Sequence, residues 1–170
     1  MHDPDVTEER YLQVIRSKTA KLFEAAAQIG ALIADANPEQ IEAAAEYGRS
    51  LGTAFQLIDD VLDYSGNADD TGKNVGDDLR EGKPTLPLIY LMKNGTEEQK
   101  SLVRTCIEQG DESQFDAILA AITQSGALDY TKDEAQKAAT RAADSVAALK
   151  EGPYKQALLD LTRFAVGRNH

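Results

Sequence analysis

GTAFQLIDDVLD, residues 52–63, is typical of the middle of a long helix that is apolar on most sides. It holds three aspartates within five residues, Asp59, Asp60 and Asp63. Helical spacing places Gln56, Asp60 and Asp63 on one face. Like charges at i,i+3 and i,i+4 cost a helix roughly 0.2–0.5 kcal/mol per pair, and no lysine or arginine on that face offsets them. We therefore expect a cation from outside the segment, and hard divalent cations prefer such oxygen ligands.

Composition narrows the class of protein. A chain of 170 residues suits a single domain over 1–170, and 42% apolar with 28% charged residues is ordinary for a globular protein. Abundant alanine and scarce β-branched runs predict an all-α fold. A net charge of −11 argues against nucleic acid as a partner. A lone cysteine, no apolar run of membrane-span length and no signal peptide lead us to expect a cytoplasmic protein.

The apolar periodicity predicts about six to seven helices separated by an irregular segment. Within the second helix, Gly48 and Gly52 stand one turn apart on one face and each costs about 1 kcal/mol relative to alanine. A close approach of another helix would offset that cost, and so would space kept open for a ligand. The expected helices run from 8 to 34, 38 to 64, 86 to 93, 96 to 110, 113 to 126, 131 to 150 and 154 to 166, with a capping box of Thr131 and Glu134 opening the sixth.

The irregular segment, residues 65–87, is predicted to be a long flexible loop. Loops of this length without regular structure are usually functional or disordered. It carries Lys73 and Lys83, each preceded by glycine. A Gly-Lys pair brings a flexible backbone and an ammonium group to one place, which suits a phosphate. Each pair alone is weak evidence, but both follow the aspartate cluster directly.

The ligand types in the sequence indicate which metal ion the aspartates could bind. The plain alternative is that Asp59, Asp60 and Asp63 form a solvated helix face, but their apolar neighbours indicate a central helix, where charges need a cavity or a metal. A di-iron bundle needs Glu-x-x-His repeats, zinc needs Cys and His clusters, and the residues after Asp69 lack the EF-hand pattern. Magnesium, which takes one or two carboxylates plus phosphates and waters, is left.

A family resemblance rests on several motifs in order. They are Lys18-Thr19, Phe-Gln-x-x-Asp-Asp-x-x-Asp at 55–63, Gly72-Lys73, and Gly-Lys-Pro-Thr-Leu-Pro at 82–87. Together they resemble the C-terminal half of the trans-polyprenyl diphosphate synthases, most of all the bacterial octaprenyl or long-chain type. The resemblance covers nearly all 170 residues, although the last 75 match mainly as helices.

The resemblance implies a role for each residue. Asp59, Asp60 and Asp63 would be the second aspartate-rich motif and would hold Mg²⁺ against an allylic diphosphate, with Asp59 the first choice as direct ligand. Lys18, Lys73 and Lys83 would contact the diphosphate, and Lys83 would also help close the loop. Thr19 and Gln56 would line the cavity near the developing allylic cation. Isopentenyl diphosphate would then add five carbons, while an apolar cavity keeps water from the cation.

The sequence also departs from that family. A first Asp-Asp-x-x-Asp with a following Arg-Arg should lie upstream, and only 17 residues precede Lys18. We therefore expect a half enzyme, inactive alone, that forms a homo-oligomer or joins another synthase subunit. Without facing helices, apolar residues around Phe55, Leu57 and Ile58 should be exposed. The alternative is a non-catalytic truncated or regulatory subunit that associates with a full-length synthase.

Overall fold

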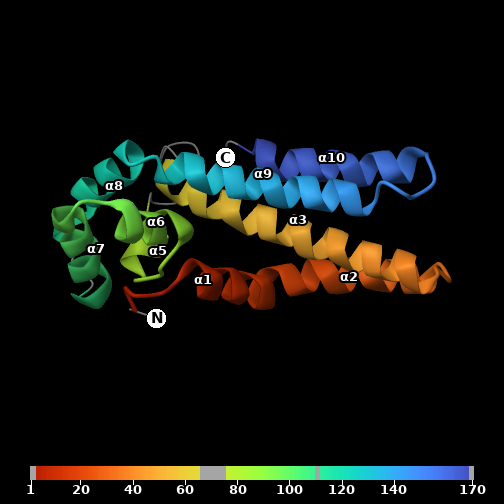
Figure 1. The fold of residues 1–170 in the computed structure, drawn as a ribbon, viewed down its shortest axis with the longest axis horizontal. Coiled ribbons are helices and arrows are strands. Elements are labelled where there is room, and N and C mark those ends of the chain that lie inside the picture. The colour runs from red at the N-terminus through yellow and green to blue at the C-terminus, as the bar shows by residue number, and fades with distance from the viewer. Residues whose placement is uncertain (1–2, 66–75, 110–111, 169–170) are drawn as a thin grey trace. The chain divides into compact units, whose positions relative to one another are not determined.

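The structure, a computed structural model, describes residues 3–65, 76–109 and 112–168, and every regular element in those ranges is helical (Figure 1). The predicted all-α class is confirmed. Contacts divide the chain into two compact units, unit 1 from 1–11, 59–132 and 169–170 and unit 2 from 12–58 and 133–168. The expectation of a single domain stays a prediction. Within the described ranges, no helix is long and apolar enough to cross a membrane.

The first predicted helix is helical throughout but is not uniform. It consists of α1 (Glu8–Ile15), a π-helical segment η1 (Arg16–Ala20) and α2 (Lys21–Ile33). Apolar periodicity predicted the helix but not the wider turn, because one inserted residue barely changes a repeat of 3.6. Single π-helical turns are rare and are often found at functional sites. The π-helical turn contains both Lys18 and Thr19.

The second predicted helix is confirmed as α3 (Pro38–Ser65), which passes from unit 2 into unit 1. A reciprocal capping box fixes its start: the Gln40 amide N–H donates to Asn37 Oδ1 at 2.9 Å, and the Asn37 amide N–H donates to Gln40 Oε1 at 3.1 Å. The proline at the first helical position needs no amide partner there.

In unit 2 the glycines of α3 permit a close approach of the preceding helical segment. A Cβ at Gly48 would lie 2.3 Å from the carbonyl oxygen of Phe23, and one at Gly52 would lie 2.7 Å from Cα of Ala20. Of the two explanations open from the sequence, the close helix contact is therefore confirmed. The rings of Phe23 and Phe55 pack beside it, with centroids 5.7 Å apart.

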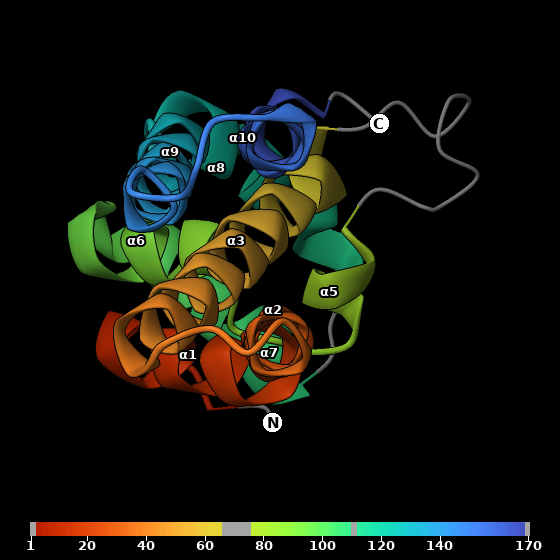
Figure 2. The same ribbon diagram turned by 90° about the vertical axis from the view of Figure 1, so that its right-hand side faces the viewer.

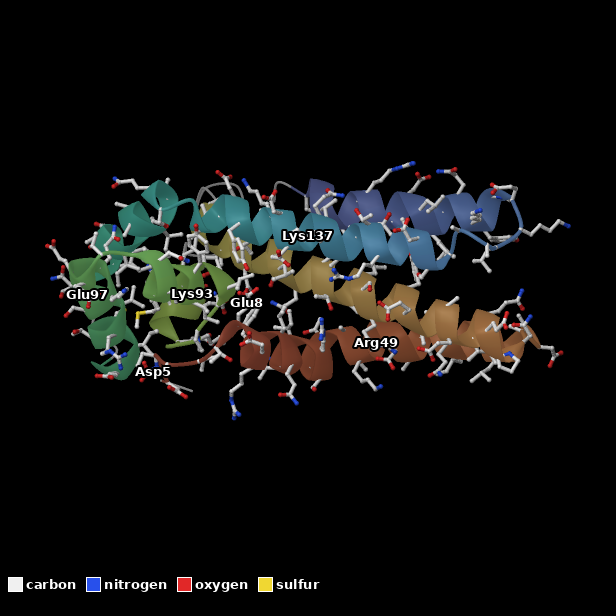
Figure 3. All side chains as sticks on the ribbon, in the orientation of Figure 1. Asp5, Glu8, Arg49, Lys93, Glu97 and Lys137 are labelled. Atoms are coloured by element: carbon white, nitrogen blue, oxygen red, sulfur yellow. The ribbon has the colours of Figure 1, made fainter. Side chains whose placement is uncertain are left out.

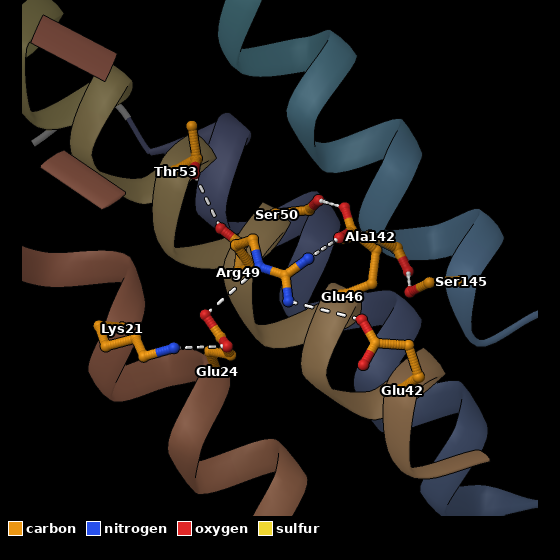
Figure 4. Close-up of polar contacts among 9 residues, drawn as sticks. All are labelled: Lys21, Glu24, Glu42, Glu46, Arg49, Ser50, Thr53, Ala142 and Ser145. Atoms are coloured by element: carbon orange, nitrogen blue, oxygen red, sulfur yellow. Dashed lines mark hydrogen bonds and ion pairs between the residues drawn. The ribbon is translucent and has the colours of Figure 1, made fainter. Parts of the chain in front are cut away.

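Figure 4 shows polar contacts between the same two helices. Arg49 of α3 donates from Nε to Glu24 of α2 at 3.3 Å and also pairs with Glu46 and Glu42 of its own helix. Lys21 donates to Glu24 at 2.8 Å. A half-buried guanidinium with three carboxylates loses little by desolvation, so this network fixes the rotation of α2 against α3.

The C-terminal helices complete unit 2, where α9 lies beside α10 (Figure 2). α9 is Ala127–Ser145 and α10 is Pro153–Gly167. Ala54 of α3 is fully buried against Ala138 and Ala139. The small side chains let these helices pack closely, which explains the alanine enrichment.

The predicted start of α9 is wrong. Thr131 does not cap a helix but lies inside one, where its hydroxyl donates to the Ala127 carbonyl one turn earlier at 2.8 Å. The helix starts after Gly126, whose φ of 79° also ends α8. It ends at Ser145 rather than near Lys150.

Unit 1 consists largely of short helices around one apolar cluster. The segment 65–87, predicted as loop, contains the helix α5 (Asp77–Arg80), and its residues 66–75 lie outside the description. The other elements are α6 (Leu86–Asn94), α7 (Glu97–Gln109), η2 (Glu112–Gln114) and α8 (Phe115–Gln124), close to the predicted bounds. The core includes Tyr64, Leu79, Leu88, Leu91, Val103, Cys106, Ile107, Ile118 and Ile122.

The predicted apolar surface is in a different place. Leu57 and Ile58 are only 1% and 4% exposed, so the expectation that they face solvent is wrong. Strongly exposed apolar residues occur instead on α2 and α10. None of the residues of α2 is buried, and Leu22 is 73% and Ile33 80% exposed.

Candidate active-site residues

The three aspartates of α3 lie in unit 1 and have different surroundings. Asp60 is 2% exposed, and its Oδ2 accepts a hydrogen bond of 2.5 Å from the hydroxyl of Tyr11 in α1. Tyr11 is itself only 6% exposed. Burial, and next the charge of Asp60, raise the pKa of Tyr11 well above its usual value, so the phenol remains a neutral donor. Sequence reasoning missed Tyr11, because nothing in its local pattern marks a partner 49 residues away.

Asp63 is held by the start of α5. Its carbonyl oxygen accepts from the Gly76 amide at 2.7 Å, and its Oδ2 accepts from the Asp78 amide at 3.2 Å. Burial, and next the charge of Asp78, raise the pKa of Asp63 to about 6. The amide donors act in the opposite direction and lower it. Asp63 is therefore fixed in position but poorly neutralised by the described protein.

Asp59 differs from both. Its side chain is partly exposed, and no hydrogen bond or ion pair reaches it from the described residues. Among those residues, no group of three or more His, Cys, Asp or Glu side chains is arranged to hold a metal ion without further ligands. Magnesium prefers one or two carboxylates completed by phosphate and water. The donor set therefore fits a magnesium ion that arrives with a diphosphate and does not fit a preformed protein cage.

Lys83 follows α5 and is engaged with acids of unit 1. Its Nζ lies 2.9 Å from Oδ1 of Asp78 and 2.6 Å from Oε2 of Glu81. Hydrogen bonds to Glu81 and Asp78 raise the pKa of Lys83 further, so it stays charged. Since the amide of Asp78 also bonds to Asp63, Lys83 partly balances the charge beside the aspartate motif. Lys73 lies outside the described residues.

Lys18, Thr19 and Gln56 lie in unit 2. The hydroxyl of Thr19 donates to Oε1 of Gln56 at 3.1 Å, which brings together two of the predicted residues. Lys18 is exposed, and no acid of the described chain pairs with it. Its ammonium group is thus available to an anionic ligand. The π-helical turn and the glycines of α3 together allow the Thr19–Gln56 contact.

A second residue missed from the sequence is Arg168, near the end of unit 2. Its Nη2 donates to the Phe55 carbonyl oxygen at 3.0 Å, and its guanidinium carbon lies 3.9 Å from the centroid of the Phe55 ring. Cation–π contacts of this kind favour arginine over an aromatic face. Arg168 gave no sequence signal, because a lone arginine after a predicted helix is usually solvated.

Unit 1 also contains a cavity of about 660 Å³, and none of the three aspartates of the motif lines it. Asp5, Glu8, Lys93 and Glu97, labelled in Figure 3, line it together with Arg104. Arg104 pairs with Asp5 at 2.5 Å. Its lining includes none of the predicted site residues. Its charges are largely satisfied by one another, so it offers no clear ligand chemistry.

Comparison with known proteins identifies the family. The sequence profile named "Polyprenyl synthetase" matches residues 1–123. Octaprenyl diphosphate synthase from Escherichia coli K12 is 48% identical over 170 residues, covering 99% of this chain and 53% of that protein. A nonaprenyl diphosphate synthase from Rhodobacter capsulatus is 48% identical over 167 residues, covering 98% of this chain and 51% of that protein.

Solved structures agree. A polyprenyl synthase from Caulobacter crescentus CB15, in complex with calcium and isoprenyl diphosphate, superposes with a TM-score of 0.92 at 39% identity, covering 99% of this chain and 52% of that one. The chain thus spans about half the length of the relatives it matches. On the profile match and the shared fold, the chain belongs to the polyprenyl synthetase family.

Proposed function

We propose that this chain supplies the second aspartate-rich motif of a magnesium-dependent polyprenyl diphosphate synthase that extends an allylic diphosphate with isopentenyl diphosphate, with an octaprenyl-like product. The observation that carries the proposal is the carboxylate of Asp59, which no described residue contacts by a hydrogen bond or ion pair, beside two aspartates held by unit 1. Prenyl transfer is the chemistry of the family. A relative solved with calcium and isoprenyl diphosphate supports a divalent cation together with a prenyl diphosphate.

We assign the acidic residues to the metal and the lysines to the diphosphate. Asp59, with Asp63 and Asp60 in support, would hold magnesium. Bound magnesium would neutralise the negative charge that builds on the leaving diphosphate. Lys18 and Lys73 would contact that diphosphate through their ammonium groups, and Lys83 would join them only after releasing Asp78 and Glu81.

Reaction at the carbon centre is assigned to the residues of unit 2. The allylic C–O bond breaks, the isopentenyl double bond forms a C–C bond to the cation, and a proton leaves the adduct. Thr19 and Gln56 would lie near the cation, where their mutual hydrogen bond fixes both side chains. Apolar residues of α3 would exclude water from it.

The test is ligand-dependent stabilisation. Ligand at about 100 times its Kd adds roughly 2.7 kcal/mol, which for this size raises Tm by about 5–10 °C. Mg²⁺ with a non-hydrolysable allylic diphosphate analogue should produce this shift in the wild type. Asp59→Ala should abolish it, whereas Asp144→Ala, at an exposed aspartate of α9, should retain it. No shift in the wild type, or an equal shift in Asp59→Ala, contradicts the proposal.

Turnover is a separate question. The sequence carries one Asp-Asp-x-x-Asp motif, and the family resemblance implies that catalysis uses two. We therefore expect the purified chain to give no product from allylic and isopentenyl diphosphates. Any chain elongation, detected by radiolabelled isopentenyl diphosphate, would show that this expectation is wrong.

A second candidate is a non-catalytic subunit that associates with a synthase or with itself. The observation that favours it is α2, an apolar helix with Leu22, Ile29 and Ile33 exposed. Exposed apolar surface of this kind favours association. Light scattering should then show an oligomer that Leu22→Glu dissociates, while Gln136→Glu, an added charge at an exposed position of α9, leaves it intact. A wild-type monomer counts against self-association.

A further inference from the structure

The contact between Tyr11 and Asp60 is the least ordinary feature of the aspartate motif. A buried carboxylate usually needs a cation or several donors, since its desolvation costs several kcal/mol. Here a neutral phenol donates to Asp60 at 2.5 Å, and both residues are more than nine-tenths buried. The phenol comes from α1 and reaches the last two turns of α3. Such a long-range pairing needs a reason beyond helix formation.

The three aspartates show what the pairing achieves. Asp63 is tied to the amide of Asp78, whereas Asp59 receives no hydrogen bond from the described residues. Asp60 follows Asp59 directly, so without a restraint both carboxylates could reach the same ligand.

We infer that Tyr11 is a positioning residue: its hydroxyl holds the Asp60 carboxylate inside the protein, so that Asp59 is the neighbouring carboxylate presented to a magnesium diphosphate. This inference rests on the proposed function for its ligand. On this inference, Asp60 supports the site and is not itself a ligand of the magnesium ion. Residues that support metal ligands typically change metal affinity about 10- to 100-fold when mutated.

Tyr64 provides a matched control. It is also a buried tyrosine of unit 1, it belongs to α3, and its hydroxyl lies 2.8 Å from the hydroxyl of Thr85. Its partner is neutral and lies outside the aspartate motif. Removing the hydroxyl of Tyr64 therefore reproduces the loss of a buried hydrogen bond without removing a donor from the carboxylates of the motif.

The experiment compares Tyr11→Phe, Tyr64→Phe and the wild type. Thermal unfolding is followed at increasing Mg²⁺ with a fixed concentration of inorganic pyrophosphate. We expect both variants to melt below the wild type, but only Tyr11→Phe to need about 10-fold or more Mg²⁺ for the half-maximal shift. A purely structural role would lower the melting temperature without moving that midpoint. Equal Mg²⁺ midpoints for the two variants would overturn the inference.

A metal-free measurement separates this inference from the proposed function. Tyr11→Phe, Asp60→Asn and the double variant form a cycle in urea unfolding without Mg²⁺. A charge-assisted hydrogen bond predicts that the two substitutions are coupled by roughly 10- to 100-fold in the unfolding equilibrium constant. Additive effects would overturn the inference whatever the metal does. A wild type that shows coupling but no response to Mg²⁺ and pyrophosphate would instead overturn the proposed function and the assignment of Asp59.

Discussion

Replacing Gly48 by alanine tests how closely α2 and α3 approach. In an open helix this substitution would stabilise by about 1 kcal/mol, because alanine is the better helix former. At position 48, however, the new Cβ would lie 2.3 Å from the Phe23 carbonyl oxygen and 2.7 Å from Cα of Glu24. Both are backbone atoms, so no rotamer change relieves the overlap.

The magnitude follows from these distances. Carbon atoms pack at about 3.5–4.0 Å, so the two helices would have to separate by about 1 Å. Overpacking of this kind costs roughly 1–3 kcal/mol, and the rigid neighbours place Gly48→Ala near the upper end. After subtracting the gain in helix propensity, we expect a net loss of about 2 kcal/mol, or about 4–8 °C in Tm.

Gly30→Ala is the matched control, since Gly30 lies inside α2 and a Cβ there would meet no atom within 4 Å. This variant should be more stable than the wild type by about 0.5–1 kcal/mol. Urea unfolding followed by circular dichroism measures both. If Gly48→Ala were as stable as Gly30→Ala, the close contact between α2 and α3 would be refuted.

Two further substitutions test charge and capping. The pKa of Asp63 is raised from 3.8 to about 6, so the folded state binds the proton more tightly and stability falls as pH rises through that window. Asp63→Asn should weaken the pH dependence of stability and raise the free energy of unfolding at pH 7.5 by about 1–2 kcal/mol after solvent screening. Urea unfolding at pH 4 and 7.5 measures both quantities, and an unchanged pH dependence would contradict the prediction. Asn37→Ala should cost about 1 kcal/mol by opening the capping box of α3. An unchanged thermal midpoint would show that this cap is not needed.

Capping signatures show how far sequence reasoning could go. Asn37 with Gln40, and Thr96 with Gln99, form reciprocal capping boxes at the predicted helix starts. The pair Thr131 and Glu134 has the same spacing, yet Thr131 is buried within α9. Inside a helix, a threonine hydroxyl can donate a hydrogen bond to the carbonyl oxygen one turn earlier. The Thr-x-x-Glu pattern alone therefore cannot distinguish a helix cap from a helix interior.

The sequence proposes candidate site residues by their type but gives few of the contacts between them. The aspartates stand out as a local motif, whereas Thr19 was singled out by the family resemblance. Helical spacing is enough to group Gln56, Asp60 and Asp63 on one face of α3. Tyr11 and Arg168 could not be found this way, because their partners are 49 and 113 residues away. Periodicity gives the face of a helix but not the side chain that another helix brings to it.

The aspartate motif faces two opposing physical demands. The stretch of α3 that carries the motif is largely buried. Carboxylates that bind a cation must, however, stay ionised and accessible. The three aspartates differ in their contacts: a phenol holds Asp60, an amide holds Asp63, and no described residue gives Asp59 a hydrogen bond of either kind. If these roles are correct, neutralising Asp60 should mainly change stability, whereas neutralising Asp59 should mainly change the response to magnesium. Equal effects of Asp59→Asn and Asp60→Asn on both quantities would mean that the motif acts as one undivided charge.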